Sequence, residues 1–175
     1  MDLRTEILAK RSKTVMEALA AWVGNSKSRF AQFMELFLYD EDPVVVERSA
    51  WLLSFITDAH INLALPYLEE LMRKMVEPGA HVGVKRSICR LFQFVDNIPE
   101  ELEGELMITA FEWLADPQEA IAVRSCCMTI LDNLSKRYPE IRQELTAIIE
   151  DQLQHNPTPG FASKAKRILN KKKSV

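Results

Sequence analysis

The sequence predicts an all-α protein, an α-α superhelix (solenoid) of about four and a half stacked helical hairpins, and three observations support this fold class. The dipeptide Arg-Ser recurs at residues 11–12, 48–49, 86–87 and 124–125, in steps of 37, 38 and 38 residues. Apolar residues recur at spacings of three and four, which is the period of an α-helix. Sustained alternation of apolar and polar residues is absent, as is an Asn-Gly turn, so strands are not expected.

Turn residues divide each period into two helices, which we name A for the first and B for the second. The expected helices cover residues 3–22, 27–39, 43–58, 63–76, 81–96, 100–115, 118–137, 140–154 and 160–172. Their ends are marked by Gly24-Asn25, Asp42-Pro43, Pro78-Gly79, Pro99, Asp116-Pro117, Pro139 and Pro157-Thr158-Pro159-Gly160. Pro is tolerated in the first turn of a helix and disrupts its middle, so these residues place the boundaries.

The hairpins are expected to form one repeat domain over residues 1–175, because a single hairpin cannot bury its apolar face alone. Its units are expected near residues 1–41, 42–79, 80–117 and 118–156. The remaining segment, 158–173, is then a lone A helix with an apolar stripe of Phe161, Ala165, Ile168 and Leu169. We expect this helix to cap the last hairpin. The alternative is a basic tail that binds nucleic acid or serves as a nuclear signal.

Length and composition fit an ordinary globular domain, with 175 residues, 47% apolar residues and a net charge of −3. The slight acidity gives no general attraction to nucleic acid or to an acidic membrane. No apolar run approaches the roughly 20 residues that span a bilayer, and the charged N-terminus has no signal core behind it. We therefore expect a cytoplasmic protein without a membrane segment, with its three cysteines in the core.

No pattern in the sequence predicts enzyme chemistry. His60, His81 and His155 stand far apart, whereas a metal site needs several converging ligands. The sequence contains no phosphate-binding loop, dinucleotide-binding turn or nucleophile elbow. We therefore expect a non-enzymatic protein with no catalytic residue, no cofactor and no metal.

Two segments carry a family resemblance. Asp116-Pro117 is followed by Val123-Arg124 and Leu131, and Asp42-Pro43 is followed by Arg48. With this pattern the chain resembles the HEAT/armadillo-like helical repeat family over nearly its whole length. The resemblance implies the stacked-hairpin fold and a scaffold that binds other proteins. It also implies that the B helices line the concave face of the stack.

Arg48, Arg86 and Arg124 stand one repeat apart and form a predicted ladder. The structural interpretation is that they bond between helices, to carbonyl groups or to turn carboxylates such as Asp42 and Asp116. The functional interpretation is a row of clamps for phosphate or carboxylate groups, since the guanidinium group is a planar fork. That second interpretation requires all three groups to face solvent.

Negative charge gathers in the B helices, most strongly in residues 98–116, which contain six carboxylates and no Lys or Arg. Glu101, Glu105 and Glu112 are the candidate partner-binding residues, because an acidic concave face suits a basic protein segment. Ordinary solvated helix faces are the simpler interpretation. A nucleic-acid-binding protein resembling the DNA-alkylation-repair glycosylases is the alternative function. It is supported by the basic C-terminal segment, Lys164, Lys166, Arg167, Lys171, Lys172 and Lys173.

Overall fold

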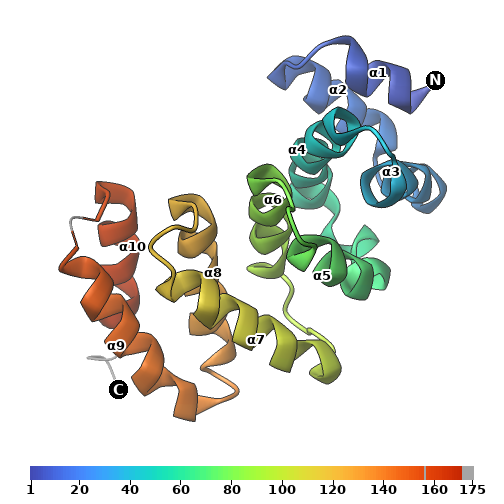
Figure 1. Ribbon diagram of the computed structural model, residues 1–175. Helices are drawn as coiled ribbons and strands as arrows, with labels where there is room; N and C mark the ends of the chain where they lie inside the picture. Colours follow the sequence, from blue (N-terminus) through green and yellow to red (C-terminus); the bar gives the residue numbers. More distant parts are fainter. Residues whose placement is uncertain (156, 171–175) are drawn as a thin grey trace. The chain divides into compact units, whose positions relative to one another are not determined.

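The computed structural model describes residues 1–155 and 157–170, and every regular element in these two ranges is a helix (Figure 1). The chain forms two compact units, Met1–Ile98 and Pro99–Val175. The all-α fold class is therefore confirmed for the described part of the chain.

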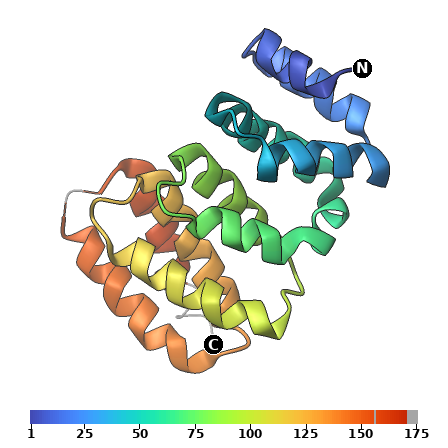
Figure 2. The same ribbon diagram turned by 45° about the vertical axis from the view of Figure 1, so that its right-hand side comes forward.

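The N-terminal unit contains six α-helices. They are α1 (Leu3–Ala9), α2 (Lys13–Val23), α3 (Lys27–Tyr39), α4 (Pro43–His60), α5 (Leu68–Val76) and α6 (Val82–Phe92). The A helices pack directly on one another, α2 on α4 and α4 on α6, while α3 packs on α4 and α5 on α6 (Figure 2). Phe30, Phe33 and Phe37 repeat at helical spacing on α3 and are fully buried. This apolar stripe holds the B helix against α4.

The prediction of one continuous helix over residues 3–22 is wrong. Residues 10–12 are not helical, and they separate α1 from α2. Lys10 is extended, with a φ of −152°, and the Ser12 hydroxyl caps α2 by accepting a hydrogen bond from the Val15 amide at 3.3 Å. The polar run around Ser12 offers no apolar side chain to bury, so a local cap decides its structure. Arg11-Ser12 therefore lies at a helix start, whereas the later Arg-Ser pairs lie inside helices.

Two predicted B helices begin later than expected. The helix expected at 63–76 is preceded by two short 3₁₀ turns, Ile61–Leu63 and Leu65–Tyr67, and its α-helical part begins at Leu68. Pro66 explains the delay, because it lacks an amide donor and its ring clashes with the preceding turn of an α-helix. In the same way the 3₁₀ turn Pro139–Ile141 precedes α9.

The repeated serines lie close to the contacts between A helices. Ser49 and Ser87 are buried, and the Ser54 hydroxyl of α4 donates a hydrogen bond to the Ser87 hydroxyl of α6 at 3.2 Å. Ser125 on α8, at the equivalent position of the repeat, is only half-buried. Its backbone carbonyl accepts a hydrogen bond from the ammonium group of Lys164 at 3.1 Å.

The C-terminal unit contains α7 (Glu100–Ala115), α8 (Ile121–Leu134), α9 (Arg142–Leu153) and α10 (Pro159–Asn170). Helix α8 packs against the other three, and α7 also packs against α9 (Figure 1). Along α8, Val123, Cys127 and Leu131 are buried at spacings of four. This stripe is the central layer of the unit.

Helix α10 covers the outer side of α8. Its Phe161, Ala165 and Ile168 are buried, as the apolar stripe in the sequence predicts. Polar bonds fix it further, because a guanidinium nitrogen of Arg142 in α9 donates to the Ile168 carbonyl at 2.8 Å. The predicted helix end at 171–172 and the basic residues Lys171, Lys172 and Lys173 lie outside the described residues.

Candidate functional site

The arginines at the repeated position do not share one environment. Arg48 is half-buried, and one guanidinium nitrogen donates to the carbonyls of Ile7 at 3.1 Å and Leu8 at 2.6 Å. These carbonyls lie in the last turn of α1, where backbone acceptors have no partner within the helix. Arg48 therefore ties the end of α1 to α4.

Arg124 is buried and plays a comparable part in the C-terminal unit. Its Nε donates to the Leu114 carbonyl at the end of α7 at 3.4 Å, and a second nitrogen donates to the Gln152 side chain in α9. Its guanidinium carbon lies 5.2 Å from the centroid of the Phe161 ring in α10. One side chain thus connects α8 with the three helices around it.

Arg86 differs from both, because it is exposed and none of the bonds found for the described residues involves it. The buried face of α6 contains Val84, Ser87 and Ile88, and Arg86 lies on the opposite side. The expected turn carboxylates also have other uses. Asp42 accepts from the Val44 amide at 2.8 Å, and Asp116 from the Gln118 amide at 2.8 Å, so both cap the segment that follows them. Neither bonds to the ladder.

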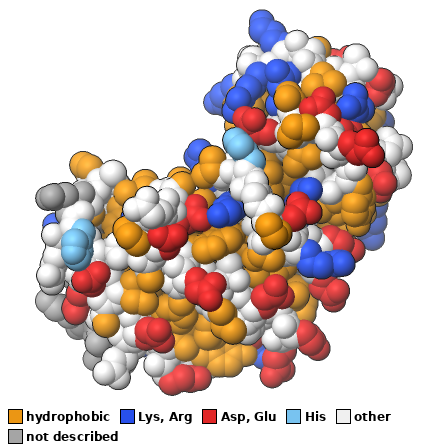
Figure 3. Space-filling model, viewed as in Figure 1, with side chains coloured by type: hydrophobic (Ala, Val, Ile, Leu, Met, Phe, Trp, Pro, Cys, Tyr) orange, Lys and Arg blue, Asp and Glu red, His pale blue; other side chains and the backbone are white. Residues whose placement is uncertain are grey.

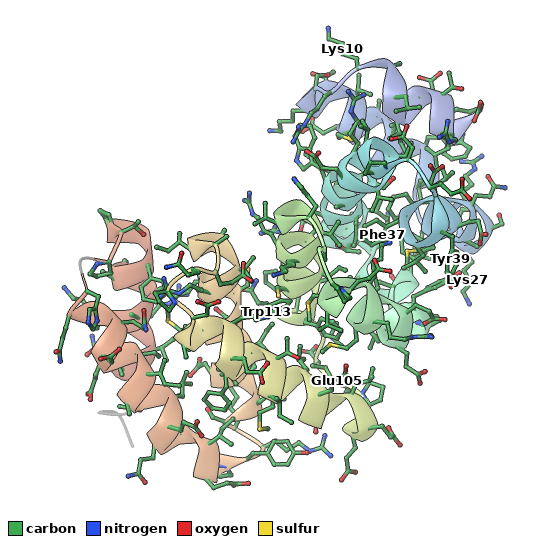
Figure 4. All side chains as sticks on the ribbon, in the orientation of Figure 1. Lys10, Lys27, Phe37, Tyr39, Glu105 and Trp113 are labelled. Atoms are coloured by element: carbon green, nitrogen blue, oxygen red, sulfur yellow. The ribbon has the colours of Figure 1, made fainter. Side chains whose placement is uncertain are left out.

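Glu101, Glu105 and Glu112 are all exposed on α7, and Figure 4 labels Glu105. At about 100° per residue, their side chains leave the helix within an arc of about 40°. They therefore form one edge of the helix, which we call the acidic edge. No ion pair or hydrogen bond of these three side chains is found among the residues that the structure describes.

Glu103 belongs to the same acidic segment and has a different role. It is 5% exposed and accepts hydrogen bonds from Arg137, at 2.9 Å, and from the Tyr138 hydroxyl. The bond to the carboxylate raises the pKa of Tyr138 above its ordinary value, because ionisation of the phenol would destroy it. Glu103 thus fastens the segment after α8 to α7. The sequence gives no signal for this role, since the partners lie more than 30 residues away.

Beside the acidic edge runs an apolar strip that sequence reasoning missed. It consists of Gly104, Ile108, Phe111 and Ala115, which fall within an arc of about 60° around α7. Ile108 is 62% exposed, and Phe111 is half-buried. The signal was available, because Ile108 stands three residues after Glu105 and four before Glu112, so helical periodicity places it next to the candidate acidic residues.

Helix α9 extends the negative charge. Its exposed residues include Glu144, Glu150 and Asp151, and its one basic residue, Arg142, is bound to the buried carboxylate of Asp132. Figure 3 shows acidic side chains among hydrophobic ones over α7 and α9. In the N-terminal unit, by contrast, α3 and α5 carry mixed charges. The acidic character of the B helices is a property of the C-terminal unit.

A cavity of about 260 Å³ lies in the N-terminal unit, between the loop before α4 and the loop before α6. Three of its charged lining residues are engaged in ion pairs. Lys74 pairs with Glu77 at 3.1 Å, and Asp40 pairs with Arg4 at 2.7 Å. The hydrogen bond from Arg4 holds the pKa of Asp40 below its ordinary value. The cavity therefore presents ion pairs instead of an arrangement of a nucleophile and a base.

The described residues contain no group of three or more His, Cys, Asp or Glu side chains placed to hold a metal ion. Within the same ranges, no helix has both the length and the apolar character needed to cross a bilayer.

The sequence matches the family described as HEAT repeat domain over residues 3–172. No curated protein and no solved structure was found to be significantly similar to the chain. HEAT repeats generally mediate protein–protein interactions, and the family is typically non-catalytic. Since the match covers nearly the entire sequence, this chain belongs to the HEAT repeat family.

Proposed function

We propose that this protein is a non-catalytic interaction scaffold whose C-terminal unit binds a basic segment of a partner protein along α7. The observation that supports the proposal most directly is the acidic edge. Glu101, Glu105 and Glu112 are exposed on one side of a helix that contains no Lys or Arg. Within the described residues they have no counter-charge. A basic segment would supply it.

The stability of the fold does not account for all three carboxylates. Glu101 lies in the first turn of α7, where the positive end of the helix dipole stabilises a negative charge. Glu112 lies in the last turn, where the dipole disfavours a carboxylate, and that turn has no basic residue. Glu112 therefore weakens α7 slightly, by about 0.3–1 kcal/mol. A binding role would explain why an acid stands there.

The spacing allows the three charges to act together on one partner. Glu101 and Glu105 are four residues apart, so their Cβ atoms lie about 5–6 Å apart, within the screening length of about 8 Å at physiological ionic strength. Glu112 lies about 10 Å further along the helix axis, on the same side of the helix, so it would contact a different part of the same partner segment. A segment with several Lys or Arg residues would meet a combined field and associate faster at low salt.

The same field disfavours a phosphate backbone on this face. Exposed Lys166 and Arg167 on α10 are the feature that favours the nucleic-acid alternative. Salt-dependent binding of a duplex DNA that is lost on replacing these two residues, with the α7 variants unaffected, would point to that alternative instead.

The test is a triple variant, Glu101→Gln, Glu105→Gln and Glu112→Gln, measured against a fluorescent Lys-rich peptide. The matched control is Glu6→Gln, Glu35→Gln and Glu41→Gln in the N-terminal unit, where three exposed carboxylates are removed with the same change in net charge. An exposed ion pair contributes about 0.2–1 kcal/mol, so loss of three such pairs in the α7 triple should weaken binding about 3- to 150-fold. The control should bind as the unchanged chain does. Equal weakening by both variants would show that net charge alone drives binding, and the proposal would fail.

A further inference from the structure

We infer that the segment bound on α7 is itself a basic amphipathic α-helix, which crosses α7 closely at Gly104 and places an apolar side chain against Ile108. This inference rests on the proposed function and adds the conformation of the partner and its line of approach.

Gly104 has no explanation within the fold. It lies inside α7 and is exposed, and a Cβ atom built there would meet nothing within 4 Å. Glycine is a poor helix former, since it loses more backbone freedom than any other residue when it is ordered. Alanine would therefore suit the isolated fold better. A missing Cβ has a use when another backbone must approach closely at that point.

The surroundings of Gly104 fit a helical partner. The apolar strip from Gly104 to Ala115 runs parallel to the helix axis for about 16 Å, which is three turns. A partner helix can lay an apolar stripe of similar length on it, with Ile108 at the centre of the contact. The adjacent acidic edge then faces one side of the partner, so basic residues are expected on that side.

An extended segment would bind this surface more weakly than a helix. The amide and carbonyl groups in the middle of α7 are used within the helix, so they offer no main-chain hydrogen bonds to a strand. A helix satisfies its own backbone groups and needs only side-chain contacts. These contacts are what the apolar strip and the acidic edge provide.

The occupant is expected to be another protein and not a second copy of this chain. Among the described helices, α6 and α10 are both basic and strongly amphipathic. Their apolar stripes are already buried, with Ile88 and Phe92 in α6 and Phe161 and Ile168 in α10. Either helix would have to leave its own unit to reach α7 of a neighbour.

The test compares two synthetic probes of equal length and net charge, made mainly of Leu and Lys. In one, Leu recurs at spacings of three and four, so that the peptide forms an amphipathic helix. In the other, the order is scrambled and two Pro residues prevent a helix. The unchanged chain should bind the helical probe at least 3-fold more tightly, because only this probe can present both stripes in register. Equal affinity for both probes would overturn the inference.

Variants at Gly104 separate the inference from the proposed function. Gly104→Ala should raise the melting temperature and weaken binding of the helical probe at least 3-fold, and Gly104→Leu at least 10-fold, with helical content unchanged in circular dichroism. Neither should affect the scrambled probe. Gly160→Ala is the matched control, because this glycine is also helical, exposed and without neighbours within 4 Å of a built Cβ, but lies on α10.

The outcomes are distinct. If both Gly104 variants bind the helical probe as tightly as the unchanged chain, the helical crossing is refuted. The acidic edge is then judged by the Glu→Gln triple, which should weaken both probes. If the triple weakens neither probe, or if the unchanged chain binds neither, the proposed function fails as well.

Discussion

Replacing Phe161 by Ala should strongly destabilise the C-terminal unit, because this side chain connects α10 to α8. Phe161 is 3% exposed, and Phe→Ala changes at buried positions cost about 3–5 kcal/mol. The ring also faces the buried guanidinium group of Arg124 at 5.2 Å, and a desolvated contact of this kind contributes up to about 2 kcal/mol. We therefore expect a loss in the upper part of that range, about 4–5 kcal/mol.

The chain offers a matched control for the same chemical change. Phe94 is 58% exposed and lies under Arg90, whose guanidinium carbon is 5.7 Å from the ring centroid. Phe94→Ala removes an aromatic ring and a cation–π contact without opening a cavity, so about 1 kcal/mol or less is expected. Urea denaturation followed by circular dichroism, together with calorimetry, measures both variants. For a unit of this size, Phe161→Ala should lower the melting temperature by more than about 10 °C.

Comparable losses in the two variants would refute the reasoning. Such a result would mean that α10 contributes little to the stability of the unit, and that Phe161 is buried in the structure without holding the helix in solution. The capping role proposed for α10 would then have to be abandoned.

Three further predictions concern the packing and the polar contacts. Leu131→Ala should cost about 2–5 kcal/mol in urea denaturation, because the side chain is fully buried on α8 and leaves a cavity. Arg48→Met should cost about 1–3 kcal/mol and speed amide exchange in α1, whereas Arg86→Met, at an exposed position, should change neither. The raised pKa of Tyr138 means that its bond to Glu103 stabilises the fold below pH 10 and is lost as the pH rises through the raised value. Tyr138→Phe should remove a tyrosinate absorbance step above pH 10, and retention of that step would assign it to another tyrosine.

Most of the fold follows from short-range signals in the sequence. Helix α3 begins and ends at the residues expected, as does α7, because Gly24-Asn25, Pro99 and Asp116-Pro117 interrupt apolar periodicity at those points. The break between α1 and α2 was missed because it depends on one capping hydroxyl. A polar run such as Lys10–Lys13 is equally compatible with the exposed face of a continuous helix.

The candidate site, likewise, could be predicted from the sequence only in part. The acidic edge was accessible from the sequence, since three residues of one helix keep their relative positions whatever the helix packs against. The buried position of Glu103 could not be predicted from the sequence, because its partners Arg137 and Tyr138 come close to it only in the folded chain. Arg86 shows the converse, because a repeated sequence position does not guarantee a repeated contact.

Three positions on α7 are not explained by the stability of the fold alone. Gly104 weakens a helix interior, Ile108 leaves an apolar side chain in water, and Glu112 opposes the helix dipole. Each costs the isolated chain a fraction of a kilocalorie to about 1 kcal/mol, and none is compensated by a contact among the described residues. Independent imperfections would be scattered over the surface of the unit. These three residues lie on one side of one helix, within three turns. A single basic amphipathic partner helix would pack closely at Gly104, cover Ile108 and pair with Glu112.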